Sequence, residues 1–186
     1  MFKSMSYDLN EVAKLFKQKR TLELRGMSSR LIREAAMEEN YAKAELGVIA
    51  YALHKLGTKE HISRSEKWQK LKQIISKDLD NAEYAASQND SKTLIKKLKS
   101  IVSHITLIDT ELGNYAQNVY DKAKVKSASL AYSYGLSLAQ SADLTGADKK
   151  ELQSYIGFTK MIDEETEQKK ISQRVKELSE WLEVGA

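Results

Sequence analysis

The most regular hydrophobic pattern in the chain runs from Leu94 to Val119. Apolar side chains alternate there at steps of four and three residues, at Leu94, Leu98, Ile101, Ile105, Ile108, Leu112, Tyr115 and Val119. This spacing places them on one stripe of an α-helix and is typical of helices that pack at the shallow angles of coiled coils and bundles. The pattern predicts one long helix from Ser91 to about Ala123.

Three further helices are predicted before this segment. Asp8 with Glu11, and Ser63 with Glu66, have the spacing of a capping box, in which two side chains satisfy free backbone N–H groups at a helix start. The expected ranges are 9–24, ended by Gly26; 28–56, ended by Gly57; and 63–87, ended by the polar residues 88–90. The last two and the long helix are predicted to pack as an antiparallel bundle.

The chain changes character after Ala123. Residues 127–139 are small, uncharged and apolar on several faces, which suits a helix surrounded by others. A short helix at about 147–156, stopped by Gly157, comes next. A charged final segment carries one more apolar stripe, at Ile171, Val175, Leu178 and Leu182. We therefore predict an all-α protein of about six helices, with an antiparallel bundle over 1–123 and a smaller helical unit over 124–186.

Composition agrees with this fold class. The 186 residues include no proline and only eight glycines, which argues against turn-dense β architectures. No cysteine is present, so disulfides and thiolate metal sites are excluded. The longest uncharged run, 127–142, is shorter than the roughly 20 apolar residues of a membrane span. With no export signal visible at the amino terminus, we expect a cytoplasmic protein without a membrane partner.

A distinct local pattern lies between Leu138 and Gly157. Ala142 precedes Gly146 by four positions, and Leu152 follows that glycine by six. Alanine lets two helices cross closely, glycine permits the positive φ of a turn, and the leucine anchors the second helix. The pattern resembles the helix-turn-helix of DNA-binding proteins over residues 138–157, about 20 of the 186 positions. Thr145 is expected to cap the second helix.

The resemblance implies that the second helix enters the major groove of duplex DNA. The expected contact residues are Lys149, Lys150, Gln153, Ser154 and Lys160. The lysines would meet phosphates and Gln153 a base edge, and a homodimer is expected because such proteins usually bind paired half-sites. The same residues fit an ordinary corner of an all-α protein, in which Ala142 and Gly146 serve packing only, and this alternative stays open.

A basic segment near the amino terminus offers a second candidate surface. Seven bases stand against Glu23 alone, a local balance of 7 − 1 = +6: Lys14, Lys17, Lys19, Arg20, Arg25, Arg30 and Arg33. Such density on consecutive helices can follow a phosphate backbone. The alternatives are a solvated helix face and a face neutralised by the acidic segment 163–183.

No catalytic constellation is found. His54, His61 and His104 have no acid three or four residues before them, so the Glu-x-x-His pattern of di-iron bundles is absent. Phosphate loops, nucleophile elbows and zinc-binding helix pairs are also missing. We predict a non-enzymatic nucleic-acid-binding protein in a regulatory or accessory role, without cofactor, metal or small-molecule substrate. The alternative is a helical protein–protein scaffold, whose uncovered apolar stripes would form a dimer surface.

Overall fold

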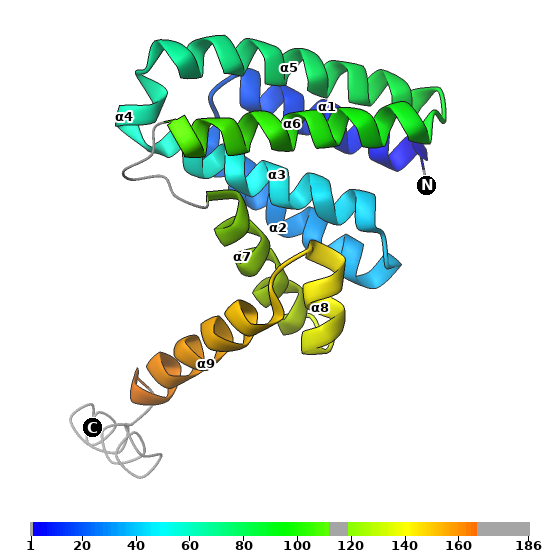
Figure 1. Ribbon diagram of the computed structural model, residues 1–186. Coiled ribbons are helices and arrows are strands. Elements are labelled where there is room, and N and C mark those ends of the chain that lie inside the picture. Colours follow the sequence, from blue (N-terminus) through cyan, green and yellow to red (C-terminus); the bar gives the residue numbers. More distant parts are fainter. Residues whose placement is uncertain (1, 112–118, 167–186) are drawn as a thin grey trace, which may run out of the picture. The chain divides into compact units, whose positions relative to one another are not determined.

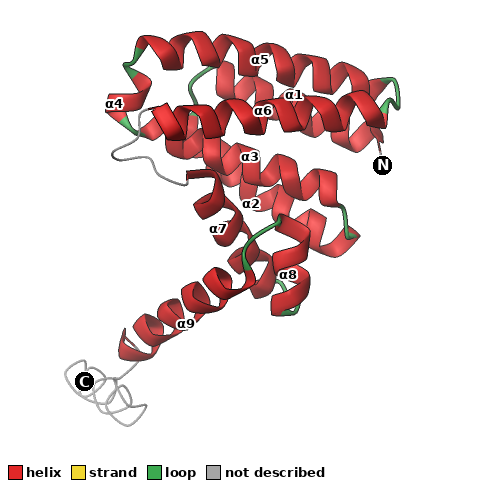
Figure 2. Cartoon of the chain, viewed as in Figure 1, coloured by secondary structure: helices red, strands yellow, loops and turns green. Residues whose placement is uncertain are grey.

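The structure, a computed structural model, describes residues 2–111 and 119–166, and within these ranges it contains helices and loops but no strand (Figures 1 and 2). The all-α prediction is confirmed. The described residues form nine helices rather than about six: α1 Phe2–Lys17, α2 Thr21–Glu38, α3 Tyr41–Thr58, α4 Glu60–Ser63, α5 Glu66–Ser87, α6 Ser91–Glu111, α7 Val119–Ser133, α8 Leu138–Thr145 and α9 Lys149–Thr166.

Three tight turns with a left-handed residue that is not glycine separate consecutive helices, and the first two lie inside the predicted helices 9–24 and 28–56. Lys19 (φ 58°), Glu39 (φ 50°) and Asn89 (φ 58°) occupy them. In each turn the next N–H donates to the carbonyl five residues earlier: Arg20 to Leu15, Asn40 to Ala35 and Asp90 to Ala85. This closure ends one helix and the next begins at once. The predicted helices 9–24 and 28–56 are therefore wrong, although the predicted end at 88–90 is confirmed.

The glycines that were expected to end helices lie inside them instead. Gly26, Gly57 and Gly157 belong to α2, α3 and α9. Among the described glycines, only Gly135 and Gly146 have a positive φ. The predicted start at Ser63 also moves, because the Ser65 hydroxyl, two residues later, accepts the N–H of Trp68 (3.1 Å) and caps α5.

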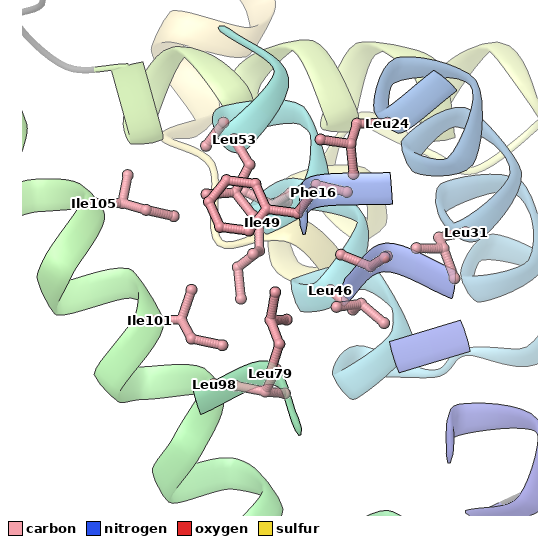
Figure 3. Close-up of a cluster of buried hydrophobic side chains, with 14 of the residues drawn as sticks. Phe16, Leu24, Leu31, Leu46, Ile49, Leu53, Leu79, Leu98, Ile101 and Ile105 are labelled. Carbon is pink, nitrogen blue, oxygen red and sulfur yellow. The ribbon is translucent and has the colours of Figure 1, made fainter. Parts of the chain in front are cut away.

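The first compact unit covers residues 1–152 and has α3 at its centre. The pairs α2/α3 and α5/α6 are antiparallel hairpins, because short loops join helices that pack together; α1 packs against α5 (Figure 1). At Gly47 the α2/α3 approach is close enough that a Cβ atom would lie 2.9 Å from Ile32 Cδ1. The core gathers apolar side chains of α1, α2, α3, α5 and α6, as Figure 3 shows around Ile49.

The apolar stripe predicted from Leu94 to Val119 belongs to the hydrophobic core wherever the structure describes it. Leu94, Leu98, Ile101, Ile105 and Ile108 are each 3% exposed or less. The chain itself covers these positions, so the expected dimer surface is absent from the described part of the stripe. Leu112 and Tyr115 lie outside the described residues. Val119 begins α7, which packs against α6; the part of the predicted helix 91–123 between them lies outside the described residues.

The division between the two compact units falls after Leu152, inside α9, whereas the sequence predicted it near Ala123. The reason is that α7 and α8 pack on α2 and α3 and so belong to the first unit. The prediction of a surrounded helix over 127–139 holds only in part: Ser127, Ala128 and Ala131 are buried, but α7 ends at Ser133, before a turn at Gly135 (φ 100°), and residues 133–135, 137 and 139 are exposed. The second unit comprises residues 153–186; the predicted stripe at 171–182 lies outside the described residues.

Candidate nucleic-acid interface

The segment with the helix-turn-helix pattern forms two helices and a glycine turn. A complete capping box starts α8: the Ser137 hydroxyl accepts the N–H of Gln140 (3.2 Å), whose side chain accepts the N–H of Ser137 (3.0 Å). The helix ends at Gly146 in the left-handed conformation (φ 67°). The N–H of Ala147 then donates to the Ala142 carbonyl (3.0 Å). Glycine is required here because a Cβ atom strains this backbone conformation.

Asp148, and not Thr145, caps α9. The Asp148 carboxylate accepts the N–H groups of Lys150 and Glu151, both at 2.9 Å. The Thr145 side chain is buried and donates instead to the Ser141 carbonyl (2.9 Å) within α8. The expectation that Thr145 caps the second helix is therefore wrong, because its hydroxyl is already satisfied one turn back in its own helix.

Both apolar residues of the pattern are buried. Ala142 is buried in the middle of α8, and Leu152 is fully buried in the first turn of α9. Tyr155 and Ile156, one turn further, are partly buried. Leu152 therefore anchors the first turn of α9 in the first unit, and the exposed side chains beside it remain for a ligand.

The side chains expected to contact DNA lie on the exposed side of α9. Lys149, Lys150, Gln153 and Ser154 are all exposed. At 100° per residue, Lys149 and Gln153 are about 40° apart around the helix axis. Lys160 also belongs to α9, but its side chain lies outside the described residues.

Two acids share the start of α9 with the two lysines. Asp148 is occupied by the backbone N–H groups that it caps, where a negative charge also complements the helix dipole. Glu151 is exposed and lies about 160° around the axis from Lys149. The positive charge of α9 is thus concentrated on the side that holds Lys149 and Gln153.

The basic segment of α1 and α2 is more neutralised than its sequence indicates. Four of the seven bases form ion pairs: Lys14 with Glu11 (3.9 Å), Lys17 with Asp80 (2.6 Å), Arg20 with Glu23, and Arg30 with Asp8 (2.7 Å) and Glu34 (2.8 Å). Within the described residues Lys19, Arg25 and Arg33 have no ion pair and are exposed. The acids Asp8, Glu11, Glu34 and Asp80 lie outside the 14–33 window or on another helix, so a local count could not reveal them.

Sequence reasoning also missed a buried charge cluster around Lys43. This side chain is 2% exposed, and its Nζ lies 3.1 Å from carboxylate oxygens of Glu34 and Glu38 and 4.0 Å from the buried Asp8. Burial alone would lower the pKa of Lys43, but its hydrogen bonds to Glu38 and Glu34 raise it above the ordinary value. The lysine is therefore charged, and it joins α1, α2 and α3 as a structural element.

Comparison with protein-family models, with curated proteins and with solved structures finds no match to this chain. In residues 2–111 and 119–166 no three His, Cys, Asp or Glu side chains gather as ligands for a metal ion. None of the helices described is long and apolar enough to cross a membrane. A function for this protein therefore has to be inferred from its own side chains and their arrangement.

Proposed function

We propose that the exposed side of α9 binds the major groove of duplex DNA and that the protein has a non-enzymatic, regulatory or accessory role. In this proposal Lys149 and Lys150 contact phosphates, while Gln153 reads a base edge with Ser154 beside it. Lys160, further along the helix, adds a phosphate contact. A homodimer that reads two half-sites is part of the proposal.

The observation that carries this proposal is the sidedness of α9. Leu152 is buried while Lys149, Lys150, Gln153 and Ser154 are exposed. The left-handed Gly146 and the buried Ala142 set the turn that precedes them. A recognition helix needs both properties, an anchored inner side and polar residues free on the outer side at its amino-terminal end.

A contribution from the first unit's basic surface is also proposed, and it is smaller than the sequence indicates. Lys19, Arg25 and Arg33 remain without an ion pair in the described residues. Cations of this kind add phosphate contacts that carry no sequence information and that weaken with salt. Their removal is therefore expected to weaken binding equally for all DNA sequences.

The test is fluorescence anisotropy with a labelled duplex, titrated at several salt concentrations. We expect measurable affinity that falls with salt, because binding releases counterions from the phosphates. Replacing both Lys149→Ala and Lys150→Ala removes two phosphate contacts and should lower the slope of log K against log salt by about 2. Titration to saturation gives the number of chains per duplex, with two expected for a homodimer.

A matched control removes the same number of positive charges from another helix. Lys96 and Lys99 are exposed on α6, and the double variant Lys96→Ala, Lys99→Ala should bind as the parent does. An RNA duplex should bind more weakly, because the A-form major groove is too narrow for side chains to read. Equal weakening by both double variants, or no binding to duplex DNA, would overturn the proposal and favour a protein-binding scaffold.

A further inference from the structure

The first unit contains a cavity of about 350 Å³ beside the turn that joins α1 to α2. Its apolar wall includes Phe16, Leu24, Leu53 and Trp68. The Trp68 ring meets the Phe16 ring edge-on, with centroids 6.0 Å apart. The rest of the lining is polar or charged, apart from Gly57: Lys19, Thr21, Ser63, Arg64, Gln69 and Lys72. A volume in this range that joins an aromatic wall to convergent polar groups is typical of sites for small organic ligands.

Two lysines with no acidic partner meet at this cavity. Lys19 and Lys72 both line it, and none of the described residues that line it is acidic. The partly buried Lys72 places its Nζ 5.8 Å from the centre of the Phe16 ring. Burial, and then the like charge of Lys19, lower the pKa of Lys72. Two cations therefore converge over an apolar wall without a counter-ion.

Other charged side chains near these two lysines form ion pairs with one another. Arg64, also at the cavity, pairs with Glu60 (3.3 Å). A neighbouring depression of about 460 Å³ shares Lys72 with the cavity and contains Asp80, but that carboxylate is held by Lys17 at 2.6 and 2.8 Å. Neither Lys19 nor Lys72 has an ion pair in the described part of the chain.

We propose that this cavity binds a small amphipathic anion, with its carboxylate or phosphate between Lys19 and Lys72 and its apolar body against Phe16 and Trp68. An anionic head would supply the missing counter-charge, and the partial burial of Lys72 strengthens the attraction. The apolar body would gain from leaving water. The cavity belongs to α1–α5 and shares no residue with the side of α9 proposed to bind DNA; Lys19 alone is common to the cavity and to the basic surface proposed to add phosphate contacts.

The experiment is isothermal titration calorimetry of the full chain with three probes that share a naphthalene body: 2-naphthoate, 2-naphthyl phosphate and the neutral 2-naphthamide. Both anions, or one of them, should bind at least about tenfold more tightly than the amide, as expected for charge-assisted hydrogen bonds. The two anions distinguish a carboxylate ligand from a phosphate ligand.

Variants locate the site. Lys72→Gln and Lys19→Gln should each weaken binding of the preferred anion by about tenfold. The matched control is Lys70→Gln, which removes an exposed lysine of α5 that does not line the cavity; it should bind as the parent does. Circular dichroism checks that each variant is folded. Equal affinity for anion and amide, no binding of any probe, or unchanged affinity in Lys72→Gln would overturn the proposal.

Discussion

Replacing Lys43 with methionine tests whether the buried charge cluster holds the first three helices together. Methionine keeps the length and the apolar stem but removes the ammonium group. Asp8, 1% exposed, would then rely on Arg30 alone, and its second carboxylate oxygen, Oδ2, already accepts no hydrogen bond within the described residues. Lys43→Met therefore leaves negative charge in the core without its nearest buried counter-charge.

The expected loss of stability follows from the exposure of the three carboxylates. Breaking a buried pair by removing one partner destabilises by about 3–5 kcal/mol. Glu38 is half exposed, so it returns to water and contributes at most about 1 kcal/mol, as surface pairs do. Asp8 and the partly buried Glu34 bear most of the loss. We expect about 3 kcal/mol in all, at the lower end of the range for buried pairs.

Urea unfolding followed by circular dichroism measures this loss. For a chain of this size, about 3 kcal/mol corresponds to a fall in Tm of roughly 6–12 °C. The control Lys96→Met, at an exposed position of α6, should stay within about 0.5 kcal/mol of the parent. Adding Asp8→Asn to Lys43→Met should recover part of the loss, because the uncompensated charge is removed. A change below about 0.5 kcal/mol in Lys43→Met would refute the reasoning.

Three further predictions concern a core isoleucine, the protonation of His54 and the close packing at Gly47. Ile105→Ala, at a fully buried position, should destabilise by about 2–5 kcal/mol in urea unfolding; a change typical of surface sites would contradict its place in the core. Burial lowers the pKa of His54 below its ordinary 6.5, so below that pH the unfolded chain takes up a proton that the folded chain does not, and stability falls. His54→Gln should remove this fall in stability below pH 6.5, and an unchanged pH dependence would contradict its assignment to His54. Gly47→Ala forces a contact with Ile32 and should destabilise by about 1–3 kcal/mol, whereas Gly26→Ala, with open space at its Cβ, should stabilise by up to about 1 kcal/mol; equal effects in thermal melts would contradict the close helix approach.

Helical periodicity predicts the core of this fold well. A helix that repeats apolar residues at three and four positions must cover that side. The described stripe of α6 is buried as its spacing predicts. The residues of α5 with the same spacing are buried too: Trp68, Leu71, Ile75, Leu79, Ala82 and Ala86. The hairpin loop at 88–90 was predictable for a similar reason, since polar residues interrupt both stripes. The pattern of apolar positions thus identifies which helices share a core.

The ends of the other helices could not be predicted from the types of residue present. Left-handed turns occur at Lys19 and Glu39, residue types that rarely adopt this conformation, while Gly26 and Gly57 lie inside helices. Tertiary packing decides these positions. At Gly57, for example, a Cβ atom would meet the Thr21 side chain at 2.7 Å, so the glycine serves a close approach rather than a helix end.

The exposed and buried sides of α9 could be predicted from the local sequence pattern, whereas the ion pairs of the basic segment and the burial of Lys43 could not. The pattern predicted that Leu152 is buried and Lys149 exposed, because both positions are set by their distance along the helix from Gly146. The pairing of Arg30 with Asp8, and the burial of Lys43, join segments that are far apart in the chain. Spacing along the sequence carries no signal for such pairs, which only the packing of α1, α2 and α3 creates.

The measurement that tests the central claim most directly is a nuclear magnetic resonance titration of the ¹⁵N-labelled chain with duplex DNA, with amide shifts assigned along the chain. The side of α9 that carries Lys149, Lys150, Gln153 and Ser154 is predicted to contact the groove, so the largest shift changes should fall on residues 148–154 and shrink as salt is added. Shift changes that leave α9 unaffected while DNA binds elsewhere, or a spectrum that does not change at all, would contradict the account.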